Sequence, residues 1–82
     1  MKRRVTQRLQ REGWLVVHII QCSLNGWPDT IAMKDGKIYF IEFKQPGKKP
    51  RELQEYRLKK IRDQGFETLV IDNEKPTTAM GL

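Results

Sequence analysis

Several residue types are scarce in this chain, and their scarcity excludes whole classes of protein. Cys22 is the single cysteine among 82 residues, which rules out a disulfide framework or a zinc site built on several cysteines. The longest apolar run, Trp14 to Ile20, is interrupted by His18 and is far shorter than the roughly 20 residues that span a bilayer. A chain of this length is expected to form one domain, residues 1–82, with a thin hydrophobic core.

The same scarcities indicate where the protein works. One free thiol fits a reducing compartment, in which disulfides do not persist. No signal-peptide pattern precedes the apolar run at Trp14. We therefore expect a cytoplasmic protein with no membrane partner.

Acidic residues are outnumbered, and the excess positive charge is concentrated in two segments. The net charge is +6. Residues 1–13 hold five basic residues and one acidic residue, and residues 44–62 hold eight basic and two acidic residues. Such clusters favour a polyanionic partner, because each neutralised phosphate releases counterions. We expect DNA to contact residues from both segments, namely Arg3, Arg4, Lys48, Lys49 and Arg51. A merely well-solvated surface is the alternative.

Hydrophobic periodicity and turn signals predict the order helix, three strands, helix, strand. The expected helices cover residues 2–12 and 51–64. The expected strands cover residues 14–20, 29–34, 37–44 and 66–72, the first of them buried on both faces. Asp35-Gly36 is a strong two-residue hairpin signal. A helix between the last two strands favours a parallel pair. The predicted fold class is α/β, in the order αβββαβ, with a mixed sheet flanked by helices.

The third predicted strand places a carboxylate and an amine on one face. Side chains alternate along a strand, so Glu42 and Lys44 point the same way at its end. The hairpin folds the second strand back alongside, which brings Asp29, at the start of that strand, near the end of the third. Asp29, Glu42 and Lys44 should therefore converge at one edge of the sheet.

Two carboxylates and one amine at one point suit metal-assisted phosphodiester cleavage. Mg²⁺ prefers oxygen ligands and keeps several waters, so Asp29 and Glu42 would suffice, with the backbone carbonyl of Phe43 as a further ligand. The metal activates water and phosphate, and the Lys44 ammonium can offset charge on the phosphate. The plainer alternatives are that Asp29 shapes a turn and that Glu42 and Lys44 form a surface pair.

The residues around these positions resemble a known nuclease signature. Pro28-Asp29 followed by Glu42-Phe43-Lys44 resembles the PD-(D/E)xK motif. Asn25-Gly26-Trp27-Pro28-Asp29, the Asp35-Gly36 hairpin and a following helix with Gln54 make residues 13–72 similar to the VRR-Nuc (virus-type replication-repair nuclease) family. The resemblance implies a metal-dependent nuclease with a restriction-endonuclease-like core.

The resemblance also implies roles for particular residues. Asp29 and Glu42 would bind Mg²⁺ or Mn²⁺, and Lys44 would be the catalytic lysine. Gln54 falls inside the apolar stripe of its helix. A buried amide needs partners, so Gln54 either points at the active site or bonds to backbone.

One feature departs from the family pattern. Members usually carry a glutamate early on the first helix, but residues 1–11 contain no acid. Glu12 is the single candidate there and lies at the end of the predicted helix. Either the site lacks this ligand or the helix is shorter, which puts a second metal ion in doubt.

The favoured function is a homodimeric endonuclease that cuts four-way (Holliday) junctions, because small stand-alone members, as phages and bacteria encode them, resemble junction resolvases. The tail over residues 73–82 is a candidate dimer arm. One alternative is a basic nucleic-acid-binding module without catalysis, and another is a nuclease for ordinary duplex or nicked DNA. His18 is interpreted as a packed or edge histidine, not a catalytic base.

Overall fold

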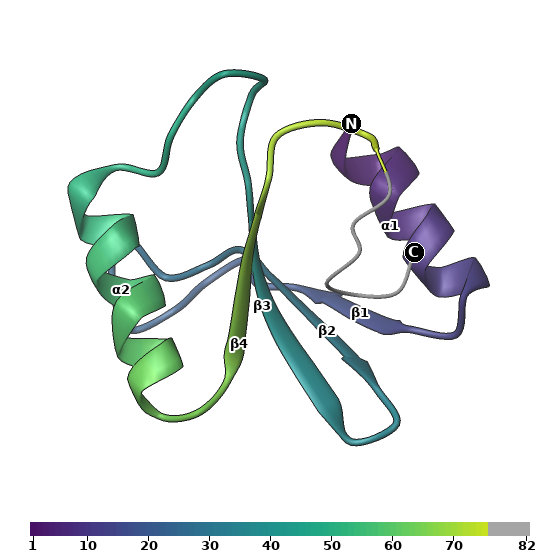
Figure 1. The fold of residues 1–82 in the computed structure, drawn as a ribbon, viewed down its shortest axis with the longest axis horizontal. Helices are drawn as coiled ribbons and strands as arrows, with labels where there is room; N and C mark the ends of the chain where they lie inside the picture. Colours follow the sequence, from purple (N-terminus) through teal and green to yellow (C-terminus); the bar gives the residue numbers. More distant parts are fainter. Residues whose placement is uncertain (76–82) are drawn as a thin grey trace.

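Two helices lie on opposite sides of a four-stranded sheet (Figure 1). The computed structural model describes residues 1–75. The helices are α1 (Lys2–Arg11) and α2 (Glu52–Asp63), and the strands are β1 (Leu15–His18), β2 (Thr30–Lys34), β3 (Lys37–Phe43) and β4 (Glu67–Ile71). The α/β class and the order αβββαβ predicted from the sequence are confirmed.

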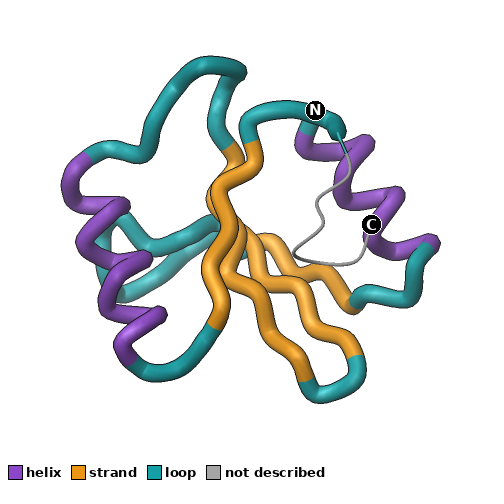
Figure 2. Tube along the Cα trace, in the orientation of Figure 1, coloured by secondary structure: helices purple, strands orange, loops and turns teal. Residues whose placement is uncertain are grey.

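The sheet is mixed and its strands follow one another in sequence order, β1-β2-β3-β4. β1 pairs with β2 and β2 with β3 in antiparallel fashion, whereas β3 and β4 are parallel and joined through α2 (Figure 2). The β2–β3 hairpin turns at Asp35 and Gly36, with φ values of 51° and 79°. Two successive positive φ values define the hairpin turn that Asp-Gly favours.

The main core fills the space between α1 and the sheet. Val5 and Leu9 recur at helical spacing, so both face the strands, where Ala32 and Ile41 are fully buried. Trp14 closes one end of this core and meets Tyr39 edge to face, with ring centroids 5.6 Å apart. This packing fixes the alternation of β3, because Tyr39 and Ile41 face α1 and Glu42 must face the other way.

On the opposite face, α2 holds the loop that leads into β2. Leu58 and Ile61 are the buried residues of the helix. Gly26 has a φ of 78°, and a Cβ built on it would lie 2.7 Å from Cγ of Leu53. Arg57 Nε donates a hydrogen bond of 2.9 Å to the carbonyl of Asn25. The close approach at Gly26 and the Arg57 contact hold residues 25–29 against α2.

The predicted burial of the first strand on both faces is wrong. Leu15 and Val17 are 61% and 41% exposed, and Ile20, beyond the strand, is 97% exposed. β1 lies at the edge of the sheet and pairs with β2 alone. α1 covers one face of it, where Val16 packs against the core, and no other described element covers its second face.

Candidate active site

Asp29 and Glu42 meet where β2 begins and β3 ends. The strand register pairs Thr30 with Ile41, so Asp29 and Glu42 are the next opposite positions of the two strands. The backbone N–H of Asp29 donates a hydrogen bond to the Glu42 carboxylate. The convergence expected from the hairpin is present in the structure.

Glu42 is a buried carboxylate among polar groups. Its side chain is 7% exposed, and Lys44 Nζ lies 3.7 Å from its Oε1. Burial raises the pKa of Glu42, the negative charge of Asp29 raises it further, and Lys44 lowers it. The Glu42 carboxylate is therefore harder to ionise than a solvent-exposed one, and a further positive charge at the site would favour its ionised form.

Gln54 connects α2 to this carboxylate. Its Nε2 donates to Glu42 Oε1 at 3.3 Å, and its Oε1 accepts the backbone N–H of Arg51 at 2.9 Å. Arg51 is the N-cap of α2, so the second bond satisfies one of the free donors at the helix start. The Gln54 side chain therefore contacts both the Glu42 carboxylate and the backbone.

The structure adds Lys2 to the site, which sequence reasoning counted only as part of a basic segment. Lys2 Nζ lies 3.7 Å from Asp29 Oδ2 and 5.8 Å from the centre of the Phe43 ring. Asp29 is thus paired on its outer oxygen, whereas Glu42 is paired with Lys44. The sequence gives little indication of this contact, because the distance between Lys2 and Asp29 depends on where the start of α1 lies over the sheet.

A chain of hydrogen bonds also connects Asp29, through Thr30 and His18, to Thr6 on α1. Thr30 Oγ1 donates to Asp29 Oδ1 at 2.9 Å. His18 Nδ1 lies 3.1 Å from Thr30 Oγ1, and Thr6 Oγ1 lies 3.4 Å from His18 Nε2. Because the Thr30 hydroxyl donates to Asp29, it accepts from His18, which fixes the hydrogen on Nδ1. His18 is an edge residue that orients Thr30, in line with its interpretation as a packed or edge histidine.

Comparison with known proteins gives a consistent picture. No protein-family model matches the chain. A phage protein described as "Putative nuclease p44", from Acyrthosiphon pisum secondary endosymbiont phage 1, is 25% identical over 75 residues, which are 90% of this chain and 81% of the phage protein. A solved structure described as "VRR_NUC domain" aligns with a TM-score of 0.81 over 89% of this chain and 81% of its own, at 24% identity. The chain has the VRR-Nuc fold. The resemblance predicted from the sequence is thereby confirmed at the level of the fold.

Within this VRR-Nuc fold, the missing acid of the first helix is not replaced by Glu12. Glu12 is the C-cap of α1, and its carbonyl accepts a 2.6 Å hydrogen bond from Lys34 Nζ. Glu12 follows Lys2 by ten positions, which is about 15 Å along the helix axis. The end of α1 that reaches Asp29 carries Lys2, a cation.

The donor set fits a hydrated divalent cation. Among residues 1–75 no group of three or more His, Cys, Asp or Glu side chains gathers as a metal cluster. The Asp29 side chain is 33% exposed and accessible to solvent, whereas the Glu42 side chain is only 7% exposed. Two carboxylates suit Mg²⁺ or Mn²⁺, which retain waters, and not a closed zinc site.

A basic hollow adjoins the carboxylates on the VRR-Nuc fold. Its volume is about 520 Å³, and Lys44 belongs to both the hollow and the carboxylate cluster. The lining residues are Phe43, Lys44, Gln45, Lys48, Lys49 and Arg51. The three basic residues expected to grip phosphate therefore lie beside the site.

The two arginines expected to bind DNA lie on α1 and differ in their contacts. Arg3 lines a shallow hollow with Lys2 and His18. Arg4 pairs with Glu74 at 3.4 Å, which ties it to the segment after β4.

No helix of the described residues is long and apolar enough to cross a membrane.

Proposed function

We propose that the protein is a Mg²⁺- or Mn²⁺-dependent endonuclease that hydrolyses phosphodiester bonds in DNA. The observation that carries the proposal is the set of contacts around Glu42. A buried carboxylate lies opposite Asp29, within 3.7 Å of a lysine ammonium and 3.3 Å of a glutamine amide. Burial disfavours the ionised form of Glu42 and Lys44 favours it, so a cation bound between the two carboxylates would stabilise the charged form further.

Each site residue has a chemical role in this proposal. Asp29 and Glu42 hold the metal ion, with the Phe43 carbonyl as a further ligand, and the bound metal supplies Lewis-acid activation of the phosphodiester and of the attacking water. Lys44 donates hydrogen bonds toward the water or phosphate and offsets developing negative charge. Gln54 keeps the Glu42 carboxylate in its orientation.

DNA binding is assigned to the basic groups around the site. Lys48, Lys49 and Arg51 contact phosphates from the hollow next to Lys44. Arg3 and Arg4 contact them from α1. Contacts to phosphate fix the position of the duplex and carry little sequence information. The proposed substrate is branched DNA, with four-way (Holliday) junctions first among the candidates.

A homodimer fits this substrate, because two cuts related by two-fold symmetry need two sites. The exposed face of β1 supports the proposal, since Leu15 and Val17 are exposed apolar side chains on an edge strand. The tail residues Ala79, Met80 and Leu82, expected to pack on a partner, lie outside the described residues. The face of β1 is therefore the candidate contact surface.

The test is incubation with end-labelled linear, flap and four-way DNA, each with Mg²⁺ or with EDTA. The proposal predicts cleavage with Mg²⁺ and none with EDTA, and the highest cleavage rate on branched DNA. Binding of all three substrates without any cleavage, in Mg²⁺ and in Mn²⁺, would refute the nuclease and leave a nucleic-acid-binding module. Equal rates on all three would refute the branched-DNA assignment only.

A further inference from the structure

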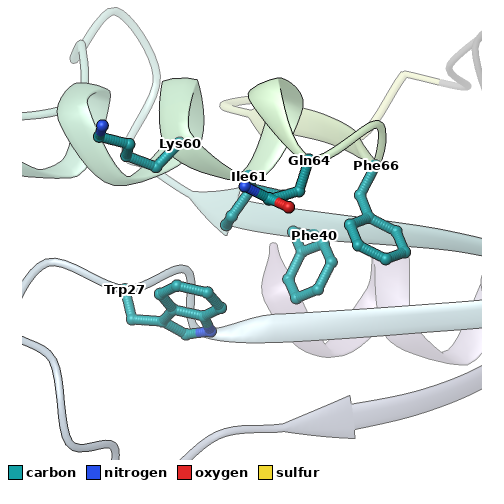
Figure 3. A pocket seen from close by; sticks show the side chains of 6 residues that line it. All are labelled: Trp27, Phe40, Lys60, Ile61, Gln64 and Phe66. Atoms are coloured by element: carbon teal, nitrogen blue, oxygen red, sulfur yellow. The ribbon is translucent and has the colours of Figure 1, made fainter.

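A second hollow lies on the α2 side of the sheet, next to the candidate active site. Its volume is about 260 Å³ and its lining is mostly apolar. The lining residues are Trp27, Phe40, Lys60, Ile61, Gln64 and Phe66. Figure 3 shows Phe40 between Trp27 and Phe66, with the side-chain amide of Gln64 extending over the same opening.

The three aromatic rings leave flat surfaces available. The ring centroids of Trp27 and Phe40 are 5.8 Å apart at an interplanar angle of 87°, and those of Phe40 and Phe66 are 5.9 Å apart at 70°. Rings that meet edge to face do not cover each other as stacked rings do, so each keeps a face that its neighbour leaves uncovered. Phe66 is 45% exposed, although it is a large apolar residue.

The two chain segments that carry the carboxylates also contribute to this hollow. Phe40 precedes Glu42 by two positions in β3, so both point to the same face and lie about 7 Å apart along the strand. Trp27 likewise precedes Asp29 by two positions in the loop held against α2. Each carboxylate-bearing segment therefore contributes one aromatic ring to the hollow.

We propose that this hollow receives one unpaired nucleobase of the DNA, adjacent to the phosphodiester bond that lies at Asp29 and Glu42. The inference rests on the proposed nuclease function and adds to it a class of substrate. Every base has a flat π face that stacks on aromatic side chains. Gln64 offers an amide donor and acceptor to a base edge.

The size of the hollow favours a base over a protein partner. Sites for drug-sized ligands occupy roughly 300–1,000 Å³, so about 260 Å³ admits one ring system. A base within a paired duplex would first have to leave its stack, which weakens binding. Among branched DNAs, those with an unpaired nucleotide beside the cut, such as bulges and flap junctions, avoid this cost, whereas a fully paired four-way junction has to unstack a base at its crossover.

The experiment compares a duplex carrying one unpaired 2-aminopurine with the same duplex fully paired, by fluorescence anisotropy in EDTA so that no cleavage occurs. The wild type should bind the bulged duplex about 5- to 150-fold more tightly, which corresponds to one stacked base. Phe66→Leu keeps an apolar side chain but removes the ring, and should lose most of this preference. Tyr56→Leu removes an exposed aromatic ring on α2 outside the hollow and should retain it.

The emission of 2-aminopurine provides a second readout, because stacking on an aromatic ring quenches it. Binding should quench the bulged base with the wild type and with Tyr56→Leu, and much less with Phe66→Leu. Equal affinity of the wild type for both duplexes overturns the inference. It is also overturned if folded Phe66→Leu still binds the bulged duplex more tightly than the paired one. Loss of self-association by Phe66→Leu, with the preference for the bulged duplex unchanged, would make the hollow a contact between two chains.

Cleavage is measured separately on the same duplexes with Mg²⁺. Cleavage without a preference for the unpaired base would contradict the base-binding hollow and leave the nuclease intact. A preference without cleavage in Mg²⁺ or Mn²⁺ would contradict the nuclease, while base binding would stand. The two failures are therefore distinguishable.

Discussion

Replacing Gln54 by alanine removes both of the side-chain hydrogen bonds through which this residue connects the start of α2 to Glu42. The 2.9 Å bond to the Arg51 N–H lies at an exposed helix start and contributes about 0.5–1 kcal/mol. The 3.3 Å bond to the buried Glu42 carboxylate contributes about 1.5 kcal/mol, the lower end for a charged acceptor. Alanine regains a few tenths of a kcal/mol as the better helix former. The expected loss is about 2 kcal/mol of unfolding free energy, or roughly 8–16 °C in Tm for a domain of this size.

Gln54→Glu separates the two contributions. A glutamate oxygen can still accept the Arg51 N–H, so the helix start is kept. It places a second negative charge beside Glu42 in place of a donor, so this variant should also melt below the wild type in EDTA. Addition of Mn²⁺ should raise the Tm of Gln54→Glu more than that of Gln54→Ala, because a third carboxylate joins the site.

Circular dichroism melts in EDTA and in Mn²⁺ measure these differences. The reasoning is refuted if Gln54→Ala melts with the wild type, since neither bond would then support the fold. It is equally refuted if Gln54→Glu is as stable as the wild type in EDTA.

Other predictions test the surrounding electrostatics. Burial and Asp29 raise the pKa of Glu42 above its ordinary value of 4.5, so ionisation of Glu42 lowers the stability of the native state as the pH rises above 4.5. In thermal melts in EDTA, Glu42→Gln should therefore stabilise the protein at pH 8 and not at pH 4. Destabilisation at pH 8 would identify a structural ion pair. Lys44→Ala should slow single-turnover cleavage by about 10²- to 10³-fold and leave calorimetric Mn²⁺ affinity at pH 8 largely unchanged; an unchanged rate would return Lys44 to a surface pair. Combined alanine substitution of Lys48, Lys49 and Arg51 should flatten the slope of log affinity against log salt by up to about 2.7 units, and an unchanged slope would remove this loop from the phosphate contacts.

The parts of the fold that local signals determine were predictable from the sequence. Asp35-Gly36 adopts two positive φ values with little strain, so the hairpin and the register that it sets follow from two residues. The alternation of β3 then assigns Glu42 to the face opposite Tyr39 and Ile41. The exposure of β1 did not follow, because an apolar β-branched run looks alike at the centre and at the edge of a sheet.

The site divides in the same way. Asp29 and Glu42 converge because a short hairpin joins their strands, which sequence alone can show. Lys2 reaches Asp29 through the packing of α1 across the sheet, which no local pattern encodes. The aromatic hollow could not be predicted either, since Trp27 lies before β2, Phe40 in β3 and Phe66 before β4, and only the packing of the chain brings them together. Contacts between segments far apart in sequence depend on the packed core, and these are the ones that the sequence left open.

The most direct test of the central claim is the Mg²⁺-dependent cleavage rate of Asp29→Asn beside that of Asp63→Asn. Asp63 is an exposed carboxylate at the end of α2, paired with Lys59, so its substitution controls for the loss of one charge. Asp29→Asn should cut at least about 10²-fold more slowly while it binds DNA as the wild type does in EDTA, and Asp63→Asn should cut normally. A folded Asp29→Asn protein that cuts at the wild-type rate would contradict the assignment of this site.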